Sequence, residues 1–257
     1  MFSIGDPALP APRPEVESDA ELEELEEAST WSKLPRSGPH ALVRQPLRAC
    51  DAIAATGNSA LSLLWHCPNR GELAGGLLIP EQSARGRSFN ANSLLNQIRF
   101  ADNNVLLAHL DCASAVSPSR HRAVAHALRS AVTADRWIAL TCLSASAVQA
   151  SACNGCCYCL PTAAERHQRS QELPLPEFSA GMLLPGSAGA LVSAAQSRGE
   201  RALALVACFD GPSEPDALKM LAQTLDSEVP GFSFLDGVRD AAASLERADM
   251  QMPSVYS

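Results

Sequence analysis

The sequence predicts an α/β fold: a three-layer α/β sandwich with a parallel or mixed sheet, preceded by a disordered N-terminal tail. Two observations predict it. Three apolar runs are continuous rather than alternating, namely Val105–Leu110, Trp137–Leu143 and Ala202–Phe209, and such runs are typical of strands covered on both faces. Segments with helical spacing lie between these runs, and strands that alternate with helices favour a sheet with helices on both sides.

The first strand of this sheet is predicted at Cys50–Thr56, a run of small and apolar residues that ends at a Gly57-Asn58 turn. Ser59–Cys67 follows with apolar side chains at helical spacing, and Pro68 ends that helix. We therefore expect a strand, a tight turn and a helix in direct succession.

Four further helices are predicted from apolar residues three or four positions apart. One of them opens with Ser213-Glu214-Pro215, which places a capping side chain, an acid and a proline in the first turn. The predicted helices are Ser119–Val132, Ser187–Gln196, Ser213–Leu225 and Gly237–Asp249.

Two segments interrupt the alternation of strands and helices. Arg70–Asn104 contains Gly75-Gly76 and a single predicted helix near Leu94–Phe100. Residues 147–178 contain clustered cysteines and three prolines, and we interpret them as a long surface loop.

The charge is unevenly distributed along the chain. The 257 residues include 28 acidic and 20 basic side chains, and eight of the acidic ones lie between Glu15 and Glu27. With seven prolines besides, residues 1–48 are interpreted as an acidic disordered tail. Residues 49–249 form the predicted α/β domain and residues 250–257 an extended C-terminal tail. Because this domain is close to neutral, nucleic acid is not expected as a partner.

The sequence favours the cytosol or the nucleus. It contains no apolar run of about 18 residues, so no membrane partner is expected, and its first residues do not resemble a secretory signal. Nine cysteines, several of them within apolar runs, suit a reducing compartment better than a disulfide framework.

A cluster of cysteines, Cys153–Cys159, raises the possibility of a zinc site. Structural zinc usually takes two ligand pairs from separate loops. Four cysteines within seven residues surround one ion poorly, and no second Cys-x-x-Cys completes a site. We therefore expect no metal and no cofactor, and keep a zinc-dependent interaction module as a third hypothesis.

An enzyme is the second hypothesis. The turn at Gly57-Asn58-Ser59 ends a strand and opens a helix, where α/β folds often place a phosphate site or a nucleophile. His109 or Asp111, near the end of another strand, could serve there as acid or base. The turn matches no standard catalytic motif, so the alternative remains an enzyme of nucleoside-phosphorylase-like or hydrolase type, and no catalytic residue is assigned.

The C-terminal sequence is more informative. Pro253 blocks continuation of the last helix, and the chain ends Val255-Tyr256-Ser257, although it contains only two tyrosines. A tyrosine beside valine and a free carboxylate forms a compact anchor with one buried ring, one hydroxyl and one charge.

This ending resembles the hydrophobic–tyrosine–any-residue motif with which proteasome activators and assembly chaperones bind the proteasome core. Three segments, Ala52–Ala60, Trp137–Cys142 and Ala202–Cys208, are similar to strands of the proteasome assembly chaperone 1 family. The resemblance implies a non-enzymatic chaperone with a three-layer α/β fold. Such a chaperone would pair with proteasome assembly chaperone 2, promote assembly of the 20S α-ring, and bind proteasome α-subunits through Val255, Tyr256 and Ser257.

Overall fold

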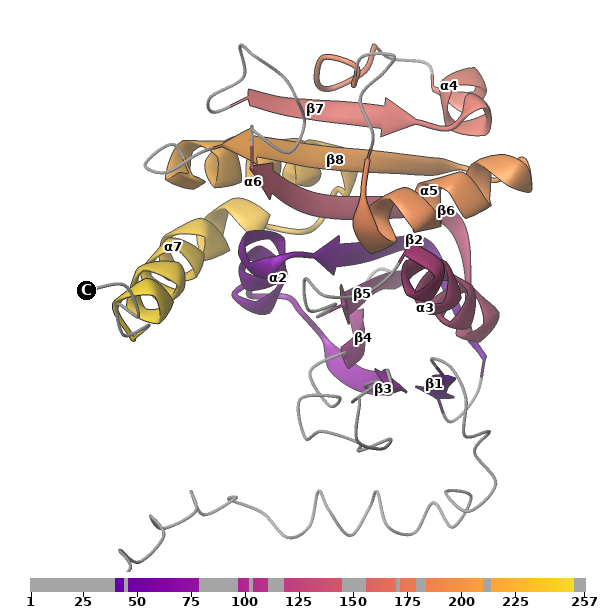
Figure 1. Ribbon diagram of the computed structural model, residues 1–257, viewed down its shortest axis with the longest axis horizontal. Helices are drawn as coiled ribbons and strands as arrows, with labels where there is room; N and C mark the ends of the chain where they lie inside the picture. Colours follow the sequence, from indigo (N-terminus) through magenta and orange to yellow (C-terminus); the bar gives the residue numbers. More distant parts are fainter. Residues whose placement is uncertain are drawn as a thin grey trace, which may run out of the picture. The chain divides into compact units, whose positions relative to one another are not determined.

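A mixed sheet of eight strands forms the centre of the protein, in the order β1-β3-β4-β5-β2-β6-β8-β7 (Figure 1). The computed structural model describes residues 40–43, 46–78, 97–101, 104–110, 118–144, 156–169, 172–178, 184–209 and 214–251. The strands are β1 His40–Val43, β2 Leu47–Thr56, β3 Glu72–Leu78, β4 Gln97–Ala101, β5 Val105–Leu110, β6 Val132–Ser144, β7 Cys156–Pro161 and β8 Ala202–Phe209.

Helices cover both faces of this sheet. They are α2 Asn58–Trp65, α3 Pro118–Ala131, α4 Ala163–Gln168, α5 Gly186–Ser197, α6 Glu214–Glu228 and α7 Phe234–Gln251. One core includes Val124 of α3 and Leu191 of α5, and the other includes Leu63 of α2, Leu221 of α6 and Phe234 of α7. Two apolar cores separated by one sheet confirm the predicted three-layer α/β sandwich.

The central strands were predictable because both of their faces are buried. β5 and β8 occupy the predicted ranges, and β2 pairs in parallel with β5 on one side and β6 on the other. In β2, successive residues from Ala52 to Ala55 are all buried and contribute alternately to the two cores. A continuous apolar sequence is the consequence of this double coverage.

The region between α2 and β5 differs from the prediction. No helix forms over Gln97–Ala101; this segment is β4, which pairs antiparallel with both β3 and β5. β3 was not predicted, because Gly75 and Gly76 weaken its strand pattern and a register shift interrupts its pairing between Leu73 and Gly75. Tertiary pairing outweighs the local preference in both strands.

The interpretation of residues 147–178 as one long loop is wrong for the part that the structure describes. β7 pairs antiparallel with β8, and its Cys157 and Cys159 are buried. α4 follows directly, capped by Thr162, whose hydroxyl accepts a hydrogen bond from the backbone N–H of Glu165 at 3.3 Å. Pro161 is tolerated because β7 is an edge strand.

Both predicted boundaries of the domain also shift. His40–Val43 is a strand that pairs with β3, and β2 begins at Leu47, so the ordered domain includes part of the predicted tail. α7 continues to Gln251 and therefore includes the first two residues of the predicted C-terminal extension. Residues 1–39, with the acidic stretch, lie outside the described residues. In the part of the chain that the structure describes, no helix is long and apolar enough to cross a membrane.

Candidate functional site

The predicted C-terminal anchor follows α7, which packs against α2 and α6. Its contact with α2 is close: a Cβ added at Gly237 would lie 2.6 Å from the carbonyl oxygen of His66. Val255, Tyr256 and Ser257 themselves lie outside the described residues, so their role stays a prediction.

The strand–turn–helix at the end of β2 is present as predicted. Gly57 takes a φ of 87°, a conformation that suits glycine, and connects β2 to α2. The hydroxyl of Thr56 donates a hydrogen bond to the carbonyl of Leu140 at 3.4 Å. Ser59 is buried, with 8% of its surface exposed. Asp111, the other residue considered there as acid or base, lies outside the described residues.

His109, the proposed acid or base, is buried beneath an aromatic ring. Its side chain is 3% exposed and meets Trp65 edge to face, with ring centroids 5.6 Å apart. Burial lowers the pKa of His109 to about 4, and the charges of Arg99 and Arg70 add to this effect. Among the described residues its Nε2 has no hydrogen-bond partner. At neutral pH the imidazole is uncharged and covered, an arrangement typical of a packed histidine.

Two arginine side chains also pack on the ring of Trp65. Trp65 is 39% exposed, and the guanidinium groups of Arg70 and Arg99 lie 5.1 and 5.9 Å from the centroid of its ring. Arg70 donates a hydrogen bond to the carbonyl of Trp65, and Arg99 donates one to the carbonyl of Gly71. We call Trp65, Arg70, Arg99 and His109 the Trp65 cluster. The sequence indicated His109 but gave no sign of the grouping, because three separate elements supply it.

Two cysteines of the candidate zinc site, Cys157 and Cys159, make hydrogen bonds within the protein core. The thiol of Cys157 donates to the carbonyl of Ala217 at 3.4 Å, and that of Cys159 to the carbonyl of Leu175 at 3.1 Å. Both side chains belong to the core shared with α2, α6 and α7. No group of three or more His, Cys, Asp or Glu side chains suited to a metal ion occurs within the described ranges, and Cys153 lies outside them.

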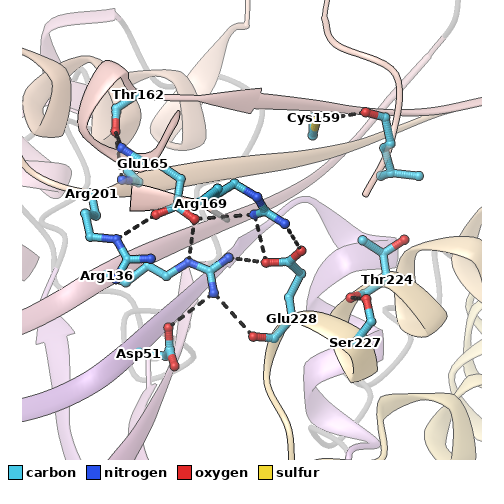
Figure 2. Close-up of polar contacts among 12 residues, drawn as sticks. Asp51, Arg136, Cys159, Thr162, Glu165, Arg169, Arg201, Thr224, Ser227 and Glu228 are labelled. Carbon is cyan, nitrogen blue, oxygen red and sulfur yellow. Dashed lines mark hydrogen bonds and ion pairs between the residues drawn. The ribbon is translucent and has the colours of Figure 1, made fainter. Parts of the chain in front are cut away.

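Sequence reasoning missed a partly buried cluster of six charged side chains, which Figure 2 shows. We call it the charged cluster; its members are Asp51, Arg136, Glu165, Arg169, Arg201 and Glu228. A signal was present in the sequence, because Arg136 and Arg201 each directly precede a continuous apolar run. A charge at the entrance of a buried strand requires a partner.

Glu165 of α4 is the centre of the charged cluster. Its carboxylate lies 3.1 Å from Nε of Arg136, 2.9 Å from Nε of Arg201 and 3.4 Å from a terminal nitrogen of Arg169. Arg169 also contacts Glu228, at 2.6 Å. Because these residues come from β6, α4, α6 and the segment before β8, the cluster fastens one end of the sheet to two helices.

The pKa values in the charged cluster reflect burial and pairing. Burial raises the pKa of Asp51 despite the nearby charge of Arg136. Burial would also raise the pKa of Glu228, but hydrogen bonds from Arg169 and Arg136 outweigh this effect and lower it. Three guanidinium groups face three carboxylates, so the cluster carries no excess charge to attract a ligand. We interpret it as structural.

Comparison with solved structures identifies the fold. PbaA of Pyrococcus furiosus, an archaeal homolog of proteasome-assembly chaperone, superimposes with a TM-score of 0.55 over 84% of this chain and 93% of its own, at 15% identity. This chain has the fold of an archaeal proteasome-assembly chaperone homologue. PbaB of the same organism, an archaeal proteasome activator, gives a TM-score of 0.56 over 83% of this chain and 98% of its own, at 12% identity.

A Thermoplasma acidophilum protein of unknown function shares the fold as well, with a TM-score of 0.56 over 93% of this chain and 96% of its own, at 11% identity. At the level of sequence, neither a known family nor a curated protein matches. The fold that the resemblance implied is thus confirmed. Because the sequence identities are this low, the roles of individual residues in those proteins cannot be assigned to residues of this chain.

Proposed function

We propose that this protein is a proteasome assembly chaperone of the chaperone 1 type. It pairs with proteasome assembly chaperone 2 and promotes assembly of the 20S α-ring. The observation that carries the proposal is the fold shared with PbaA over 84% of the chain. The terminal Val255-Tyr256-Ser257 sequence supports it independently, because fold and motif need not coincide in an unrelated α/β protein.

The proposed anchor is the Val255-Tyr256-Ser257 sequence. In a pocket between α-subunits the ring of Tyr256 supplies buried area, and the terminal carboxylate pairs with a lysine or with backbone N–H groups. Such a contact is weak by itself. The partner chaperone and the domain surface raise its effective concentration and make binding multivalent.

The proposed role is not catalytic and uses no cofactor. The buried Ser59 and the covered His109 support this reading of the turn after β2. The proposed place of action is the cytosol or the nucleus.

The test is binding of the full-length chain, together with proteasome assembly chaperone 2, to purified α-subunits. Tyr256→Ala should weaken binding at least tenfold, because it removes the ring that fills the pocket. Ser257→Ala is the matched control, since the motif accepts any residue there, and should bind like the wild type. Adding one glycine after Ser257 displaces the carboxylate and should also weaken binding. Unchanged binding by the Tyr256→Ala chain would contradict the assignment of the anchor.

A second experiment tests the function as a whole. The tagged full-length chain is purified from cells and its bound proteins are identified by mass spectrometry. The expected result is recovery of the partner chaperone and free α-subunits without mature β-subunits. Recovery of no proteasome subunit at all would contradict a chaperone role and leave the enzyme hypothesis as the alternative.

A further inference from the structure

The helical layer on one side of the sheet does not extend over all strands. α2 packs on β2, β5 and β6, and among the described helices none packs extensively on β3 or β4 on the same side. The helix that contacts β3, α3, belongs to the opposite core. The sheet therefore extends beyond α2 (Figure 1). Trp65 is the last residue of α2.

On the side of the sheet that α2 covers in part, the surface beyond Trp65 includes Leu73 and Arg99. They are paired in register across β3 and β4, so their side chains share one face of the sheet. Leu73 is 58% exposed, more than any other large apolar side chain in the described part of the chain. Glu72 is paired with Phe100, which packs in the opposite core, so its carboxylate belongs to the other face. Apolar area and two guanidinium groups thus lie side by side on this surface.

Hydrogen bonds within the protein fix the position of the Arg99 side chain on this surface. Arg99 donates through Nε to Gln97 at 3.1 Å and through a terminal nitrogen to the carbonyl of Gly71, also at 3.1 Å. Gly71 lies against β4: a Cβ there would be 2.2 Å from the carbonyl oxygen of Phe100. A fixed surface loses little conformational entropy on binding.

Composition and charge indicate what this surface accepts. Tryptophan and arginine are the residue types that dominate binding energy at protein interfaces. The chain as a whole has a formal charge of −8, yet this patch presents two arginines. A nucleic acid requires a larger basic area than two guanidinium groups. The complementary partner carries carboxylates beside an aliphatic side chain.

We propose that Trp65, Arg70, Leu73 and Arg99 form a docking surface for an acidic, leucine-containing segment of a partner protein. The aliphatic side chain packs on Trp65 and Leu73, while carboxylates on either side pair with Arg70 and Arg99. None of these four residues belongs to the C-terminal anchor, so the proposal goes beyond the proposed function and does not depend on it.

The test uses the full-length chain and a fluorescein-labelled synthetic peptide, Glu-Glu-Leu-Glu-Glu-Leu-Glu-Glu, with fluorescence anisotropy as the readout. We expect saturable binding that weakens with added salt, because exposed charges are screened. The same peptide with lysine in place of glutamate should not bind. Residues 21–27 of this chain have nearly the same sequence as the peptide, so the measurement is repeated with a full-length chain in which the five glutamates of this segment are replaced by glutamine. No saturable binding of the acidic peptide by either chain would overturn the proposal.

Variants locate the binding on the surface. Trp65→Ala should weaken binding at least tenfold, and Arg70→Gln and Leu73→Ser should each weaken it about threefold to tenfold. Met220→Ala and Arg198→Gln are matched controls, since both residues are exposed on other helices or their ends, and should bind like the wild type. Arg70→Gln leaves the tryptophan in place, so it stays informative if Trp65→Ala does not fold. Equal losses in test and control variants would overturn the proposal, as would a single-stranded oligonucleotide that displaces the peptide at lower concentration than unlabelled peptide.

Discussion

Arg136 of β6 and Glu165 of α4 form a buried ion pair, with Nε of the arginine 3.1 Å from the carboxylate. The side chain of Glu165 is 1% exposed and shares its charge with two further arginines. We expect Glu165→Gln to lower the free energy of unfolding by about 3 kcal/mol, because it leaves buried guanidinium groups without their counter-charge. Urea denaturation followed by circular dichroism measures this change.

Glu177→Gln is the control for that measurement. Glu177 pairs with Arg166 in the same region of the chain, but both side chains are largely exposed, and exposed pairs contribute about 0.5 kcal/mol or less. Equal losses in the two variants would show that the charged cluster does not stabilise the fold.

The contact between α7 and α2 makes Gly237 intolerant of any side chain. Glycine to alanine within a helix ordinarily stabilises a protein by about 1 kcal/mol. Here the added Cβ would lie 2.6 Å from the carbonyl oxygen of His66, so the helices must separate. We expect Gly237→Ala to destabilise the protein by about 2 kcal/mol. Thermal unfolding distinguishes destabilisation from stabilisation, because the first lowers the midpoint temperature and the second raises it. A raised midpoint for Gly237→Ala would contradict the close contact between α7 and α2.

The burial of His109 predicts that acid destabilises the protein. Its pKa is lowered from 6.5 in the unfolded chain to about 4 in the folded one, so the unfolded state binds a proton first as the pH falls. The neutral His109 therefore contributes fully to the free energy of unfolding above pH 6.5. This contribution is lost as the pH falls from about 6.5 to 4, and the loss is about 3 kcal/mol at most. Urea denaturation at several pH values measures this loss.

A variant separates His109 from the other titrating groups. His109→Gln should flatten the decline between pH 6.5 and 4, whereas His126→Gln, at an exposed position on α3, should leave the wild-type profile unchanged. Parallel profiles for the wild-type and His109→Gln chains would mean that His109 is not responsible.

Cys157 and Cys159 of β7 should react slowly, although the sequence around them suggests an exposed loop. Burial raises the pKa of the Cys159 thiol, and the thiolate is the reactive form. We expect iodoacetamide to label exposed Cys50 in the native protein, but Cys157 and Cys159 only after denaturant is added. Peptide mass spectrometry measures the labelled fraction at each site. Native labelling of Cys159 at the rate of Cys50 would place β7 outside the core.

Sequence alone predicts the double-covered strands and the helices beside them, because burial on both faces leaves a continuous apolar run such as Ala202–Phe209. It fails for β3 and β7. Gly75-Gly76 weakens one strand pattern, and the cysteines and Pro161 suggest a loop in the other, until pairing with β4 or β8 imposes extended structure.

The candidate sites were harder to predict than the fold. Arg136 and Glu228 are 92 residues apart, and no local pattern connects them. Trp65, Arg70 and Arg99 likewise meet only through the pairing of β4 with β5, which brings Arg99 close to the last residue of α2. The function of Val255-Tyr256-Ser257 depends on the surface of another protein, and only a resemblance suggests it.

The central position of β2 has a consequence for biosynthesis. The strand ends at Thr56, but its pairing with β6 requires residues up to Thr141. At about 5–20 residues per second, a ribosome needs on the order of ten seconds to add that stretch. Throughout this interval the apolar strand has an unsatisfied edge. We expect the nascent chain to aggregate readily when translation pauses before β6 emerges, and to depend on ribosome-associated chaperones until then.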